Sequence, residues 1–354
     1  MTEANLPLVR RRLLNWYRKN QRDLPWRRSR DPYAIWVSET MLQQTQVKTV
    51  LPYYARFVSA FPTVQSLARA PLQRVLRLWS GLGYYRRAEN LHKAARQIVR
   101  HYGGIVPREY VQLRALPGIG DYTAGALLSI AFGEQYPAVD GNVRRVLGRL
   151  VLTKSNEEIY AYAANLVKTS QPGNLNQALM ELGATLCTPK EPRCGGCPVA
   201  TDCRNLNQPG RHPAILQRQK LTSRDVTWPL AIVHYRGKIL LRRRRADGLL
   251  AKLWELPGAE ITPAQKAEAV IRKELRPLSV AGLAPQRLGE LRHSITNRRI
   301  HAPVLLYRWP VNKSAPEDKT DWRWILPTDL HRYATSSMTA KAVRLFLDHE
   351  KNPA

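Results

Sequence analysis

Cysteine is scarce in this 354-residue chain, and all four cysteines lie between Cys187 and Cys203. Acidic residues are also few, 27 against 56 lysines and arginines. No apolar run approaches the roughly 18 residues of a membrane span, and no secretory or transit pattern precedes the amphipathic stretch from Leu6 to Tyr17. These absences argue against a disulfide-rich secreted protein and a membrane protein. We expect an intracellular, cytoplasmic location in a reducing environment.

The shortage of acidic residues leaves a formal charge of +29. Such an excess predicts a polyanionic partner, and at this magnitude we favour nucleic acid over a merely solvated basic surface. The length allows roughly two domains of about 100–200 residues each.

The cysteines form one loop with the spacing Cys-x6-Cys-x2-Cys-x5-Cys, made by Cys187, Cys194, Cys197 and Cys203. Thiolates so close in sequence suit a soft metal centre. Zinc sites usually show two short cysteine pairs, so the uneven spacing fits a [4Fe–4S] cluster better than zinc. Disulfides remain a weaker alternative. The prolines and glycines between the cysteines disfavour regular structure, so the loop is expected to wrap a bound group.

Residues 1–205 show apolar residues at helical spacing, with Gly and Pro in the gaps. Asp31-Pro32 is a helix start, and the helix is expected to run through Gln46, with Ile35, Leu42 and Gln46 on the face of Glu39. A solvated glutamate is the commoner fate. However, no Lys or Arg lies within four positions of Glu39. Apolar surroundings would raise its pKa and make it an acid near neutrality.

Two glycine turns precede further helices. Leu116-Pro117-Gly118-Ile119-Gly120 predicts a tight hairpin and a helix through Thr123 to Ala131, whose free amides face an anion. A plain turn between helices is the alternative, but it seldom needs both glycines and the proline. The Gly-x-Gly turn before Tyr84 is weaker support for a phosphate contact.

Asp140 opens the run Asp140-Gly141-Asn142 and is predicted to cap a helix. A carboxylate held at a helix start, together with Glu39, makes the pair that glycosidic bond cleavage uses: one acid for the leaving group and one anion for the sugar cation. Gly118, Gly120 and Asn142 are candidate DNA contacts.

These motifs resemble the helix-hairpin-helix iron–sulfur DNA glycosylase superfamily, and within it the adenine DNA glycosylases of the MutY kind. The resemblance covers about the first 205 residues. It implies that Glu39 protonates adenine, that Asp140 stabilises the sugar cation, and that Tyr122 is the active-site tyrosine. It further implies a structural [4Fe–4S] cluster on the four cysteines. By the same resemblance, Trp26 and Arg27 are expected to line the adenine pocket, and Gln44 and Tyr84 to probe or wedge the base stack.

Two other functions fit this set of motifs less well. Endonuclease III is a glycosylase and lyase, and its hairpin helix carries a Lys nucleophile where this chain has Tyr122; an amine can form a Schiff base, and a phenol cannot. A non-catalytic iron–sulfur DNA-binding protein would not need both Glu39 and Asp140. We therefore expect a monofunctional enzyme that flips adenine out of double-stranded DNA. Its expected substrate is adenine mispaired with 8-oxoguanine or guanine in chromosomal DNA, and we expect it to act as a monomer.

Residues 206–226 have the composition of a linker. Beyond it, residues 227–354 resemble a Nudix-like α/β domain, with strands about the Arg236-Gly237 turn and a helix from about Ala264 to Leu275. Glu274-Leu275 is followed by Arg276-Pro277 rather than by a metal-holding Glu pair, so no phosphohydrolase activity is expected. In the family this domain recognises 8-oxoguanine through a Phe-Ser-His loop. Here Thr296 keeps a hydroxyl and Asn297 a donor, with Ile295 in the aromatic's place.

Overall fold

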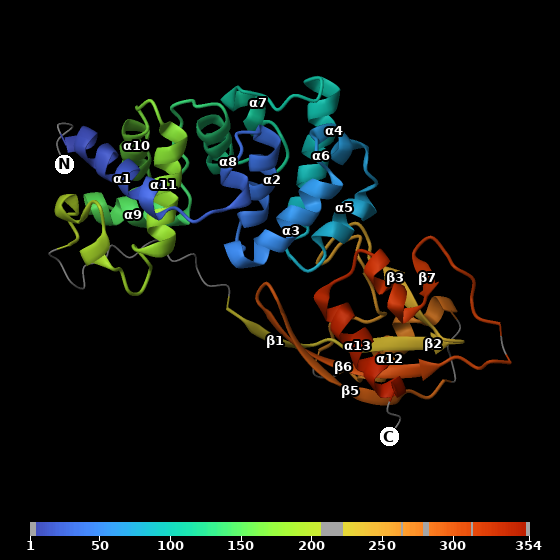
Figure 1. Cartoon of the computed structure of the whole chain (residues 1–354). Coiled ribbons are helices and arrows are strands. Elements are labelled where there is room, and N and C mark those ends of the chain that lie inside the picture. The colour runs from blue at the N-terminus through green and yellow to red at the C-terminus, as the bar shows by residue number, and fades with distance from the viewer. Residues whose placement is uncertain (1–4, 207–221, 263–264, 279–282, 313, 352–354) are drawn as a thin grey trace. The chain divides into compact units, whose positions relative to one another are not determined.

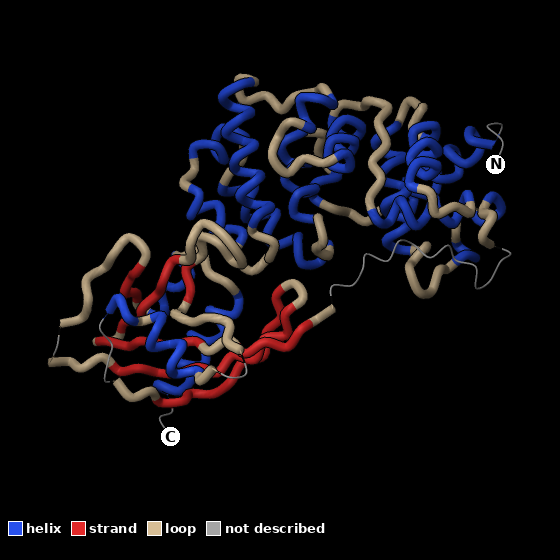
Figure 2. The backbone as a smooth tube through the Cα atoms, turned by 180° about the vertical axis from the view of Figure 1, so that it is seen from behind, coloured by secondary structure: helices blue, strands red, loops and turns tan. Residues whose placement is uncertain are grey.

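The structure is a computed structural model, and it describes residues 5–206, 222–262, 265–278, 283–312 and 314–351. By its internal contacts the chain divides into two compact units. One holds residues 1–70 and 86–218, and the other holds 71–85 and 219–354. Helices make up the first unit, and strands gather in the second (Figure 2). A helical region followed by a mixed α/β region is the predicted fold class, which is confirmed.

The first unit is built from helices joined by short turns (Figure 1). Their bounds are α1 Leu6–Asn20, α2 Pro32–Leu42, α3 Val47–Ala60, α4 Val64–Arg69, α6 Arg86–His101, α7 Tyr110–Arg114, α8 Asp121–Ala126, α9 Gly141–Val151, α10 Asn156–Leu166 and α11 Pro172–Thr185. Short 3-10 helices are η2 Pro25–Arg27, η4 Cys194–Gly196 and η5 Ala200–Asp202, and the π-helix η3 Leu127–Ala131 follows α8 directly.

One core of this unit joins α1 to α9, α10 and α11. Leu13, Val143, Leu166 and Leu179 are fully buried in it, and their removal from water provides the main stabilisation of the four helices. Val199 of the cysteine loop is buried in the same core, so this loop is anchored to α9 and α11.

Helix α2 begins as predicted but ends early. Both carboxylate oxygens of Asp31 accept hydrogen bonds, from Tyr33 N and Ala34 N, which satisfies amides that a helix start leaves unpaired. The helix stops at Leu42 because Gln43 leaves helical geometry and Gln44 is left-handed, with φ 60°. The expected continuation to Gln46 is therefore wrong, and Gln46 does not share the helical face of Glu39.

In the second unit, α5 Leu72–Trp79 belongs with the C-terminal part of the chain. Among the described residues, seven strands form one sheet in the order β1-β6-β2-β3-β4, with β5 against β6 and β7 against β3. Their bounds are β1 Arg224–Thr227, β2 Leu230–Tyr235, β3 Lys238–Arg243, β4 Trp254–Glu255, β5 Gln286–Ile295, β6 Arg298–Arg308 and β7 Trp322–Ile325.

Two helices cover the faces of this sheet. Side chains alternate along β2: Ile232 packs with α13 (Ser337–Lys351), and Val233 packs with α12 (Ala267–Glu274). Short turns η6 Arg276–Leu278 and η7 Pro327–Arg332 complete the unit.

Two details of the C-terminal expectations can be compared with the structure. The β2–β3 hairpin is confirmed, with Arg236 and Gly237 at φ 46° and 77° as a tight hairpin turn requires. The stretch expected to be a linker, residues 206–226, ends inside β1, which begins at Arg224. Residues 207–221 of this stretch, and Ala264 at the expected start of the C-terminal helix, lie outside the described residues.

Candidate active site

Most of the predicted active-site residues lie around a single cleft in the first unit. The cleft has a volume of about 1320 Å³ and opens between α2, α8, the start of α9 and α11. Trp26 and Arg27 of η2 also line it, as does Gln44 just after α2. The predicted residues along its wall are Trp26, Arg27, Glu39, Gln44, Tyr122, Asp140 and Asn142.

Glu39 projects from α2, every residue of which from Tyr33 to Met41 is buried. Glu39 itself is only 5% exposed. Burial raises the pKa of Glu39 to about 7, because a charged carboxylate loses its hydration. The nearby Asp140 charge acts in the same direction, whereas the hydrogen bond from Tyr122 and the charge of Arg27 lower this pKa. A carboxyl with such a pKa can hold or release a proton near neutral pH.

Tyr122 is brought to Glu39 by the glycine hairpin. Gly118 has φ 82°, a left-handed conformation suited to glycine, and a Cβ there would lie 2.9 Å from Asn90 Cβ. Gly120 then caps α8, whose second residue is Tyr122. The hydroxyl of Tyr122 donates to Glu39 Oε2 at 2.5 Å. Burial and the two carboxylates raise the pKa of Tyr122 well above its ordinary value, so it remains a proton donor.

Asp140 caps α9 as predicted. Its Oδ1 accepts from Val143 N at 2.7 Å, and its Oδ2 accepts from Asn142 Nδ2 at 2.9 Å. The helix start does not keep the pKa of Asp140 below its ordinary value, because burial raises this pKa. The hydrogen bonds from Val143 and Asn142 and the charge of Arg145 oppose this rise.

The backbone before Asp140 is held by Asn176 of α11. The buried Asn176 amide accepts from Ala138 N at 3.1 Å and donates to Tyr136 O and Ser129 Oγ, both at 2.8 Å. Both donor hydrogens and the carbonyl oxygen of this amide are therefore used. The segment leading to Asp140 is thus tied to η3 and α11.

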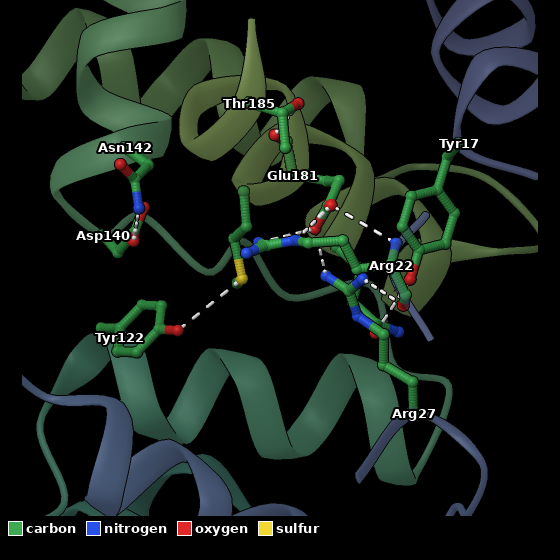
Figure 3. A network of polar contacts seen from close by, with 10 residues as sticks. Tyr17, Arg22, Arg27, Tyr122, Asp140, Asn142, Glu181 and Thr185 are labelled. Atoms are coloured by element: carbon green, nitrogen blue, oxygen red, sulfur yellow. Dashed lines mark hydrogen bonds and ion pairs between the residues drawn. The ribbon is translucent and has the colours of Figure 1, made fainter. Parts of the chain in front are cut away.

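Sequence reasoning missed Glu181, a second buried glutamate of the cleft (Figure 3). Arg22 Nε lies 2.7 Å from its Oε1, and Arg27 Nη2 lies 2.7 Å from its Oε2. Burial pushes the pKa of Glu181 up, but the hydrogen bonds from both arginines outweigh this effect and lower it. The pKa values of the two buried glutamates thus shift in opposite directions, because only Glu181 has arginine hydrogen-bond partners. Glu181 also has no Lys or Arg within four positions, the same signal that identified Glu39.

Comparison with known proteins agrees with this geometry. Residues 37–169 match the family model of the HhH-GPD superfamily base excision DNA repair proteins, and residues 229–345 match that of the NUDIX domain. The rat adenine DNA glycosylase is 36% identical over 98% of this chain and 80% of its own length. The human adenine DNA glycosylase is 35% identical over 97% of this chain and 74% of its own length. This chain belongs to the adenine DNA glycosylase family. A thermostable thymine-DNA glycosylase shares the fold of the helical part, with a TM-score of 0.54 and 29% identity over 57% of this chain and 97% of that one.

Two predicted contacts of this DNA repair glycosylase belong to the second unit and are described separately from the cleft. Tyr84 ends the Gly-x-Gly turn with φ 48°, and the residue is 46% exposed. Thr296 is exposed at the turn between β5 and β6, with φ 54°. Both side chains are therefore open to solvent on left-handed turns.

The four cysteines of this glycosylase line one cavity of about 230 Å³. In the described part of the chain, no three His, Cys, Asp or Glu side chains converge to hold a single metal ion. The cavity is several times the roughly 30 Å³ share of a water molecule, so its size suits a polynuclear group. Arg149 Nη1 lies 3.3 Å from Cys187 Sγ and also donates to Thr188 O at 2.7 Å.

None of the helices among the described residues has the length and apolar composition of a membrane span.

Proposed function

We propose that this glycosylase hydrolyses the N-glycosidic bond of adenine mispaired with 8-oxoguanine or guanine in double-stranded chromosomal DNA, and that it acts as a monomer in the cytoplasm. The main support is the buried Glu39 carboxyl, whose pKa of about 7 and 2.5 Å bond to Tyr122 suit an acid at neutral pH. Membership of the adenine DNA glycosylase family supports the choice of base.

In this mechanism Glu39 delivers a proton to the departing adenine, which makes the base a better leaving group. Asp140 lines the same cleft, where burial raises its pKa and the hydrogen bonds from Val143 N and Asn142 oppose this rise. An anion there stabilises the oxocarbenium-like sugar. The Tyr122 hydroxyl orients the carboxyl of Glu39.

The adenine must leave the base stack to reach Glu39. Trp26 and Arg27 line the cleft and are proposed to hold the flipped base. Gln44 and Tyr84 are proposed to probe and wedge the stack, and both lie on left-handed turns with exposed side chains. The amides after Gly118 and Gly120 are proposed to bind a phosphate.

The reaction is proposed to stop at base removal, because Tyr122 offers no amine for a Schiff base. Lys48 also lines the cleft, so borohydride trapping should be run on Lys48→Arg beside the wild type. No trapped complex is expected. A trapped complex that is lost in Lys48→Arg would contradict the monofunctional assignment.

We propose that Cys187, Cys194, Cys197 and Cys203 hold a [4Fe–4S] cluster. Their shared cavity supports this assignment. The cluster's contribution, when bound, is structural cross-linking of the loop rather than bond cleavage. The loop's Val199 is buried against α9 and α11, so an ordered loop also supports the helix that carries Asp140.

The Nudix-like domain is proposed to recognise the base opposite adenine through Thr296. Two of its acids do not offer open carboxylates to a divalent cation: the partly buried Glu274 pairs with Arg242, and the buried Glu255 pairs with Arg242 and Arg244 at 3.0 and 2.9 Å. This pairing supports a domain without phosphohydrolase activity.

The decisive experiment is single-turnover release of adenine from duplexes carrying adenine opposite 8-oxoguanine, guanine or cytosine. Release from the first two and little from the third is expected. Absence of release opposite both 8-oxoguanine and guanine would overturn the proposed function.

A further inference from the structure

Arg87, the second residue of α6, contacts the end of the helix that carries Glu39. Its Nη1 donates to the carbonyl oxygens of Thr40, Met41 and Gln43 at 2.9, 2.7 and 2.6 Å. Its Nη2 donates to Thr45 Oγ1 at 3.1 Å. The last carbonyls of a helix lack partners within it and carry partial negative charge, so a guanidinium satisfies both needs.

These bonds bracket Gln44. Gln43 precedes it and Thr45 follows it, and both are bonded to the guanidinium of Arg87. Gln44 itself has φ 60°, a left-handed conformation that residues other than glycine adopt at a cost and keep only where their surroundings hold them. Its side chain is exposed at the rim of the cleft. The contacts of Arg87 are placed to maintain this conformation.

We propose that Arg87 is a positioning residue that holds Gln44 in its left-handed conformation, preorganised to enter the base stack beside the target adenine. This inference rests on the proposed function, in which Gln44 probes the stack. A planar guanidinium can span the acceptors on both sides of Gln44, whereas a lysine ammonium is a compact charge without this fork. Arg87→Lys therefore keeps the positive charge but cannot form the hydrogen bonds to acceptors on both sides of Gln44.

The first test compares Arg87→Lys with Arg86→Lys in the full chain. Arg86 is the exposed neighbouring residue on α6 and serves as the matched control. Hydrogen exchange without DNA should become faster at residues 43–45 in Arg87→Lys only. Base flipping, read by 2-aminopurine fluorescence at the target position, and single-turnover adenine release should each fall about 10-fold, the order expected when a left-handed residue loses its support. DNA affinity should stay within about twofold.

The second test repeats Arg87→Lys in a Gln44→Gly background. Glycine adopts a left-handed conformation without strain and carries no side chain to insert. In this background Arg87→Lys should change base flipping by less than about twofold. An equal loss in both backgrounds, or wild-type exchange at residues 43–45, would overturn the proposal. If the wild type releases no adenine, the proposed function fails, while the exchange measurement still decides whether Arg87 holds the loop.

Discussion

Replacing Glu39 with Gln should reduce catalysis and, at the same time, stabilise the protein at alkaline pH. The wild-type carboxyl titrates near pH 4.5 when unfolded and near 7 when folded. Between these values the folded state binds more protons than the unfolded state, so stability falls as the pH rises through this window. Gln has the same shape and no charge, and it avoids this loss.

The size of the effect follows from the shift. Each pKa unit corresponds to about 1.36 kcal/mol. Part of the window between pH 4.5 and pH 7 lies below pH 5. Between pH 5 and pH 8 the free energy of unfolding of the wild type should therefore fall by roughly 2–3 kcal/mol relative to that of Glu39→Gln. Single-turnover adenine release should fall by a factor of about 10²–10⁴, as expected when a general acid is removed.

The assay is urea unfolding of both proteins at pH 5 and pH 8, followed by adenine release and DNA affinity on the same preparations. Glu109→Gln is the control, because Glu109 is an exposed glutamate with no side-chain cap bond at the start of α7. The control should match the wild type in every measurement. A stability gap for Glu39→Gln that is the same at both pH values would refute the raised pKa, and a near wild-type release rate would refute its role as the acid.

Further predictions test the rest of the site. Tyr122→Phe removes a hydrogen bond that lowers the pKa of Glu39, so the alkaline limb of the release rate should move up by about one pH unit; a limb that moves down contradicts this. Asp140→Asn should bind DNA but lose about 100-fold or more in release, since the charge facing the sugar cation is gone; an unchanged rate would make Asp140 only a cap. Metal analysis should find about four irons per chain in a brown protein, and Cys197→Ser should lose iron and DNA affinity; one zinc per chain would exclude the cluster. Log affinity for DNA should fall with log salt by about 0.9 per phosphate contacted, and a flat dependence would mean that the basic charge is only solvated.

Features that depend on a few neighbouring residues could be predicted from the sequence. Asp31 and Asp140 were predictable as caps because a cap bonds amides two or three residues away. The left-handed glycine of the hairpin and the Arg236-Gly237 turn follow from backbone sterics. Glu39 could be recognised as a buried acid from its uncharged helical neighbours.

The pKa values of these groups depend instead on contacts between segments that are distant in sequence. Tyr122 reaches Glu39 from 83 residues away, and Arg22 and Arg27 reach Glu181 from a distant part of the chain. Sequence neighbours made the two glutamates look alike, but their pKa values move in opposite directions because only Glu181 gains arginine partners. The early end of α2 is likewise supported by a residue of another helix, Arg87. Burial and charge pairing depend on segments far apart in sequence, and local patterns carry no record of which segments will meet.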